Sequence, residues 1–106
     1  MADHLADSGY KDAAAVIAGS ALEAHLRQLC QRYHVDSEAK GIRKKVDLIN
    51  SELSKAVAYS KGDQKNVTAW LDLRNKAAHG DYGAYTKDQV ALLIASVRDF
   101  ITRHPA

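Results

Sequence analysis

Apolar residues recur at spacings of three and four along most of this chain, which is the period of an amphipathic helix. The only proline is Pro105, so every residue before it keeps the backbone N–H that a helix needs. Stretches rich in Val, Ile and Thr that alternate with polar residues between turns, as strands do, are absent. The sequence therefore predicts an all-α fold.

Four helices are expected, at about residues 10–33, 42–60 and 63–80 and from residue 87 on. Their expected inward faces are Ala15, Ala18, Leu22, Leu26, Leu29 and Tyr33; Ile42, Val46, Ile49 and Leu53; and Val90, Leu93, Ile94, Val97, Phe100 and Ile101. Short connections between such helices favour an antiparallel four-helix bundle. We expect one domain over residues 1–106, in which residues 1–9 are a short lead-in.

Helix boundaries are also marked in the sequence. Asp63 is the expected N-cap of the third helix, and Gly80 is its expected left-handed end. Thr86 and Gln89 have the spacing of a capping box before the fourth helix. A basic group at 40–45 precedes the second helix and is interpreted first as a solvated charge run, and second as a contact for phosphates.

Composition narrows the functional classes. The formal net charge is only +2, which does not favour coating of nucleic acid regardless of sequence. The single cysteine, Cys30, excludes an internal disulfide and suits a reducing compartment. The apolar run Ala13–Ala18 is too short to cross a bilayer, so we expect a cytoplasmic protein without a membrane contact. The histidines and Cys30 lack metal-ligand spacing and no phosphate-binding glycine loop is present, so we expect no metal and no cofactor.

Within the third helix, Arg74 falls near the middle of the apolar arc formed by Val67, Trp70, Leu71, Leu73, Ala77 and Ala78. A buried guanidinium needs a partner, either a carboxylate, a row of carbonyls or a bound anion. One interpretation is a structural arginine that is paired with an acid elsewhere in the bundle. The other is an arginine that binds a phosphate.

His79 also has two interpretations. It lies in the last turn before Gly80, where the helix dipole favours an imidazolium, so it can be a simple terminal residue. A histidine that titrates near neutral pH can also take up and return a proton during a reaction. Thr68, Asp72, Asn75 and His79 are spaced by four, three and four residues and form one polar flank, so Asn75 lies one turn before His79.

The stretch Arg74-Asn75-Lys76-Ala77-Ala78-His79-Gly80 resembles the motif of the HEPN superfamily (higher eukaryote and prokaryote nucleotide-binding domains). That motif is an arginine, an asparagine, a short spacer and a histidine. The small-residue-rich segment 18–29 is similar to the opening helix of many prokaryotic HEPN proteins, and the resemblance spans about residues 10–103. It implies a HEPN-like bundle that forms a homodimer.

The resemblance also implies an activity, that of a metal-independent endoribonuclease of the toxin or anti-phage defence type. Two copies of the motif would share one cleft at the dimer interface. His79 would be general base or acid, Arg74 would stabilise the phosphorane, and Asn75 would position the phosphate. Products would carry 2′,3′-cyclic phosphate and 5′-hydroxyl ends. An antitoxin or defence protein is an expected partner, and RNA or a nucleotide is the expected ligand.

Lys76, Tyr82 and Tyr85 are the candidate substrate-binding residues, because a lysine can contact a phosphate and a tyrosine can stack on a base. The tyrosines have an alternative role, which is to cover the end of the bundle. In HEPN toxins that are silenced by adenylylation, a tyrosine stands two residues after the histidine. Here that position is Asp81, so silencing through that tyrosine is not expected.

Two alternatives to the ribonuclease stay open: a non-catalytic HEPN module that binds a nucleotide or acts as a dimerising adaptor, and a generic helical interaction domain. The surroundings of Arg74 and His79 separate these functions. Solvent access in a shared basic groove favours RNA or nucleotide binding. A buried ion pair of Arg74 with Asp72 or Glu23 favours a scaffold.

Overall fold

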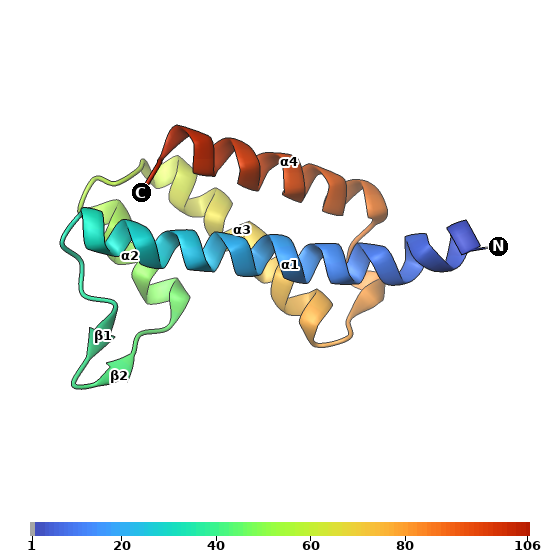
Figure 1. The fold of residues 1–106 in the computed structure, drawn as a ribbon, viewed down its shortest axis with the longest axis horizontal. Coiled ribbons are helices and arrows are strands. Elements are labelled where there is room, and N and C mark those ends of the chain that lie inside the picture. Colours follow the sequence, from blue (N-terminus) through green and yellow to red (C-terminus); the bar gives the residue numbers. More distant parts are fainter. Residues whose placement is uncertain (1) are drawn as a thin grey trace.

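The computed structural model describes residues 2–106 and, from residue 10 on, their side chains. The described helices are α1 (Ala2–Arg32), α2 (Val46–Lys55), α3 (Lys61–Ala78) and α4 (Lys87–Arg103), with a short 3₁₀ helix η1 (Tyr82–Ala84). Two strands of two residues each, β1 (Glu38–Ala39) and β2 (Ile42–Arg43), form an antiparallel hairpin between α1 and α2 (Figure 1). The expected all-α class is confirmed apart from this hairpin.

Helix α1 is the centre of the bundle. It packs against α2, α3 and α4, and α2 also packs against α3. Figure 1 shows α1 crossing the whole molecule, with α4 on one side of it and the hairpin and the end of α3 on the other. Among the described helices, none is long and apolar enough to cross a membrane.

The core lies where the apolar periodicity predicts it. The fully buried side chains come from all four helices and include Leu22, Leu26, Leu29, Ile49, Leu53, Val67, Leu71, Leu93 and Phe100. Phe100 is the aromatic centre, because Tyr59 and Trp70 both pack edge-on against its ring, at centroid distances of 5.1 and 5.8 Å. Such edge-to-face pairs stabilise a core beyond the burial of their area.

The first helix begins earlier than the sequence predicts. Residues 2–9 continue α1 instead of forming a separate lead-in. No proline interrupts the chain there, so the backbone can stay helical.

The second helix also begins later than expected, at Val46, and Ile42 is 71% exposed in the hairpin instead of facing inward. The cause is a tight turn at Lys40 and Gly41, whose φ angles are +54° and +77°. Two consecutive residues with positive φ are the geometry of a hairpin turn that matches the twist of its strands. In the sequence, the isolated Gly41 is the signal for this turn.

The start of α3 differs by three residues from the expectation. Ser60, not Asp63, is the N-cap, and its hydroxyl accepts a hydrogen bond of 3.0 Å from the Asp63 N–H. The Asp63 carboxylate instead accepts hydrogen bonds from Arg103, and the pKa of Asp63 lies below its usual value mainly because of them. The capping box of Thr86 and Gln89 at α4 is confirmed.

Candidate functional site

The motif residues lie at the C-terminal end of α3, which closes in the expected way. His79 is the C-cap, and Gly80 follows with a φ of +81°. The Asp81 N–H donates to the Lys76 carbonyl at 2.9 Å, and the Gly80 N–H donates to the Ala77 carbonyl at 3.4 Å. This pair of bonds is the Schellman motif, and it fixes the chain that leaves the motif.

Arg74 points from α3 toward α1 and has a carboxylate partner there. Its Nη1 lies 3.2 Å from Glu23 Oε1, and its Nε donates to Asn75 Oδ1 at 3.0 Å. The side chain of Arg74 is 15% exposed and that of Glu23 is 26% exposed. The guanidinium therefore lies at the margin of the core, held in one orientation from two directions.

A second arginine shares the same carboxylate. Arg27 lies one turn after Glu23 on α1 and donates to Glu23 Oε2 at 3.0 Å and to the Lys44 carbonyl at 3.0 Å. Two arginines and one glutamate leave one net positive charge in this half-buried cluster. Burial alone would raise the pKa of Glu23, but the hydrogen bonds from Arg27 and Arg74 outweigh it, so that pKa lies below 4.5.

Arg74 is not saturated by these partners. A guanidinium has five N–H groups, and the two bonds to Glu23 and Asn75 leave three of them. Among the described side chains, the buried polar atom without a partner is Nη1 of Arg27, so Nη2 of Arg74, which has no hydrogen bond to the protein, is not sealed from solvent. The arrangement can therefore present a fixed, partly exposed cation to an anion.

Asn75 and His79 occupy the outer flank of the same helix end. Both are exposed, as are Thr68 and Asp72, so the predicted polar flank of α3 is confirmed. The backbone N–H of His79 donates to the Asn75 carbonyl at 2.9 Å, but in the described part of one chain no side-chain hydrogen bond joins His79 to Arg74 or Asn75. Positions 74 and 79 are about 140° apart around a helix, so the two functional groups point in different directions. One chain brings Arg74 and Asn75 together and leaves His79 on the adjacent surface.

The three candidate substrate-binding residues have different surroundings. Lys76 is paired with Asp72 at 3.1 Å, and both partners are largely exposed, so this pair is weak and exchangeable. The Tyr82 side chain is 51% exposed at the start of η1, where a base can reach its ring.

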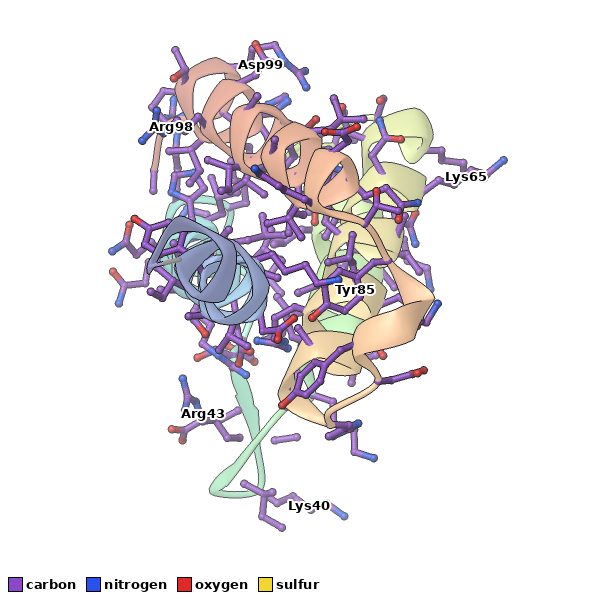
Figure 2. All side chains as sticks on the ribbon, turned by 90° about the vertical axis from the view of Figure 1, so that its right-hand side faces the viewer. Lys40, Arg43, Lys65, Tyr85, Arg98 and Asp99 are labelled. Atoms are coloured by element: carbon purple, nitrogen blue, oxygen red, sulfur yellow. The ribbon has the colours of Figure 1, made fainter. Side chains whose placement is uncertain are left out.

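Tyr85 lies in a different environment from Tyr82, since it is only 4% exposed. Its hydroxyl donates to Asp12, and the ammonium of Lys11 lies 4.7 Å from its ring centroid. Burial, and then the bond to Asp12, raises the pKa of Tyr85. Figure 2 shows Tyr85 between α1 and the chain that follows α3. Tyr85 covers the bundle end, which was its alternative role, and it offers no free face for stacking.

Sequence reasoning missed two residues of this cluster. Arg27 has the spacing of an ordinary helical ion pair with Glu23, and this spacing does not show that Arg27 shares the carboxylate with Arg74. Gly19, one turn before Glu23, was grouped with the small residues of α1, yet it lies directly beneath the stem of Arg74. The available signal was Arg74 itself, because a guanidinium in an apolar arc requires an acid opposite it.

The surroundings of Arg74 and of His79 favour two different functions. Arg74 is mostly buried and ion-paired with Glu23, which favours a scaffold. His79 is exposed, and the cluster beside it keeps a positive charge, which favours binding of an anion. Three surface grooves, two between α3 and α4 and one between α1 and α4, do not include the motif residues in their walls. In the described part of the chain, no group of three or more His, Cys, Asp or Glu side chains could hold a metal ion.

Comparison with known proteins gives no family for this chain: no family model, no curated protein and no solved structure matches it.

Proposed function

We propose that two copies of this chain act together as a metal-independent endoribonuclease of HEPN type, in toxin or anti-phage defence systems of the cytoplasm. The observation that carries the proposal is the state of Arg74. Glu23 and Asn75 hold its guanidinium in place, while the two N–H groups of Nη2 stay available at the surface margin. A cation that is fixed before the substrate arrives stabilises developing charge without reorganising.

The chemistry follows from the residue types. His79, in its neutral form, takes the proton of a ribose 2′-hydroxyl, and the 2′-oxygen attacks the adjacent phosphorus. The bond from phosphorus to the 5′-oxygen breaks, and that oxygen receives a proton from an imidazolium. Arg74 balances the charge of the phosphorane, and Asn75 orients the scissile phosphate through its exposed amide. The products are a 2′,3′-cyclic phosphate and a 5′-hydroxyl, and Lys76 and Tyr82 hold flanking nucleotides.

The proposal needs two copies, because Arg74 and His79 of one chain face different directions. In a two-fold dimer the same surface of each copy meets its counterpart, so His79 of one copy can face Arg74 of the other across a shared cleft. An apolar groove of about 440 Å³ between α1 and α4 also supports association of copies of this chain, on the side of α1 opposite the end of α3 and so separate from the shared cleft. Tyr10 and Ile17 line the groove and are 72% and 68% exposed, which is unusual for large apolar side chains.

A second function is favoured by one observation. Arg74 is 15% exposed and paired with Glu23, as expected of a structural arginine. Under this alternative the chain is a non-catalytic module that binds a nucleotide or joins an antitoxin or defence protein to its partners. The two functions differ in one outcome, since only the first makes the exposed imidazole of His79 essential.

The test is cleavage of a mixed-sequence single-stranded RNA in excess EDTA by the wild-type protein, by His79→Ala and by His34→Asn. His34 is a matched control because it is also exposed, and asparagine tolerates its φ of +57°. We expect cleavage by the wild type and by His34→Asn, and a loss of at least about 100-fold in His79→Ala. Equal activity of the wild type and His79→Ala, or none in either, would leave the non-catalytic module as the function.

A further inference from the structure

The β1–β2 hairpin carries cations that the fold does not use. Lys40, Arg43 and Lys45 are all exposed, and among the described side chains none of them has an ion partner. Glu38 stands opposite Arg43 in the strand register, but no ion pair joins them. Lys44 differs, because its ammonium binds Glu52 at 3.0 Å and is only 13% exposed. Lys40 and Arg43 are therefore two free cations of the hairpin, and Lys45 is a third that follows it at the N-cap of α2.

The hairpin and the motif lie on the same side of the bundle. In Figure 1 both the hairpin and the end of α3 project from α1 on the side opposite α4. Figure 2, turned by 90°, shows the labelled Lys40 and Arg43 at the far end of that side, below α1. Lys65 and Arg98, in contrast, lie at the upper part of that view. One ligand could contact the hairpin and the end of α3 without passing around the bundle.

A chain of hydrogen bonds joins the two regions. The Lys44 carbonyl, directly after β2, accepts from Arg27, and Arg27 also donates to Glu23. Glu23 accepts from Arg74, which donates in turn to Asn75. The net charge along this chain is positive, because two guanidiniums share one carboxylate. The hairpin and the motif are therefore linked by one set of hydrogen bonds that carries a net positive charge.

We propose that the β1–β2 hairpin is a second RNA-binding site, in which Lys40 and Arg43 contact phosphates of a single strand whose scissile bond lies at the motif. This inference rests on the proposed function, since it names a further contact for the same substrate. A hairpin tip with free lysine and arginine side chains suits the backbone of any sequence, because phosphates are the same in each nucleotide. This site increases the affinity for RNA and the number of nucleotides that the protein covers, without creating a preference for any base.

The test uses His79→Ala protein, so that RNA is bound without being cleaved. Binding of a fluorescent single-stranded RNA is measured over a series of salt concentrations for this protein and for two variants of it. One adds Lys40→Gln and Arg43→Gln. The control adds Lys61→Gln and Lys65→Gln, which remove the same charge from exposed positions in α3, where Figure 2 shows Lys65 far from the hairpin.

We expect the hairpin variant to bind about 25-fold more weakly near 0.1 M salt. The slope of the logarithm of the binding constant against the logarithm of the salt concentration should become smaller by about 1.4, because each of the two lost phosphate contacts on a single strand contributes about 0.7. The control variant should keep the parental slope. Equal slopes in both variants would overturn the hairpin site, even if the wild type cleaves RNA. The expected slopes in a protein whose wild type never cleaves would support the hairpin site and overturn the nuclease. Binding of the hairpin to anionic vesicles but not to RNA would also overturn the inference.

Discussion

Gly19 lies directly against the aliphatic stem of Arg74. A methyl group at position 19 would lie 2.2 Å from Cγ and 2.4 Å from Cβ of Arg74, far inside van der Waals contact. The missing side chain of Gly19 thus lets α3 approach α1 closely enough for Arg74 to reach Glu23, one turn further along α1. The position of the motif arginine depends on this glycine.

Substitution Gly19→Ala should therefore destabilise the protein, although alanine is the better helix former. The helical preference of alanine over glycine amounts to about 0.5–1 kcal/mol, whereas overpacking of this kind costs about 1–3 kcal/mol. We expect a net loss of about 1–2 kcal/mol in the free energy of unfolding, measured by urea denaturation. Gly62→Ala is the control, because its new methyl group would meet only Ser60 Oγ at 3.6 Å. A stabilised Gly19→Ala protein would contradict the close packing.

Glu23→Gln should lower the free energy of unfolding at neutral pH, and the difference from the wild type should disappear in acid. The pKa of Glu23 is lowered in the folded state, so its stabilisation is present above the unfolded pKa and is lost as the pH falls through the folded pKa. We expect a difference of about 2 kcal/mol between wild type and variant at pH 7. It should stay constant down to about pH 5 and narrow below about pH 4.5. Urea denaturation at each pH measures it.

The matched control is Glu38→Gln, because Glu38 is exposed and has no ion partner among the described side chains. Its difference from the wild type should be near zero at every pH. A Glu23→Gln difference that does not change with pH would mean that the charge of Glu23 contributes nothing to the fold.

Asn50 is a buried polar residue that joins α2 to α3 and to the segment between them. Its amide donates to the Gln64 carbonyl and to Thr68 Oγ1, each at 3.1 Å, and its Oδ1 accepts from the Tyr59 hydroxyl at 2.6 Å. Asn50→Leu should cost about 2–3 kcal/mol, because the buried Tyr59 hydroxyl loses its short bond to Oδ1 and keeps only the longer contact of 3.3 Å to the carbonyl of residue 50. Adding Tyr59→Phe should recover part of this loss, and strictly additive losses in thermal denaturation would contradict the network.

Ile17→Glu should abolish self-association through the groove between α1 and α4, while leaving the monomer folded. Ile17 is 68% exposed in the groove between α1 and α4, so in a monomer the substitution changes stability by less than about 0.5 kcal/mol. In a dimer that buries this groove it would place a charge in an apolar interface. Light scattering should give a dimer for the wild type and for Leu48→Glu, an exposed position on α2, and a monomer for Ile17→Glu. A monomeric wild type would contradict the dimer.

The core could be predicted from the sequence because burial follows the helical period. Leu22, Leu26 and Leu29 recur at four and three and are fully buried. The hairpin could not be predicted in this way, since two-residue strands have too few residues to show alternation, and their turn is set by the backbone angles of Lys40 and Gly41. The N-cap of α3 was misplaced because Ser60 and Asp63 are both good caps, and only the geometry selects Ser60.

The candidate site was predictable only in part. The position of Arg74 in an apolar arc required a partner, but the sequence offered several acids and could not select Glu23. Glu23 can be shared between Arg27 of α1 and Arg74 of α3 only because the two helices lie close together. Gly19 sets that distance, and no local sequence pattern reveals it. Tyr82 and Tyr85 are three residues apart with similar neighbours, yet one is exposed and the other is in the core.

We propose cleavage of RNA through the ribose 2′-hydroxyl, with His79 transferring the proton. The most direct measurement is mass analysis of the products formed in excess EDTA from a short RNA, and from the same RNA with a single 2′-deoxynucleotide at the cleaved position. We expect 2′,3′-cyclic phosphate and 5′-hydroxyl ends from the first RNA, and no cleavage at the substituted position of the second. Cleavage next to the 2′-deoxynucleotide, or products with 3′-hydroxyl ends, would contradict the proposal.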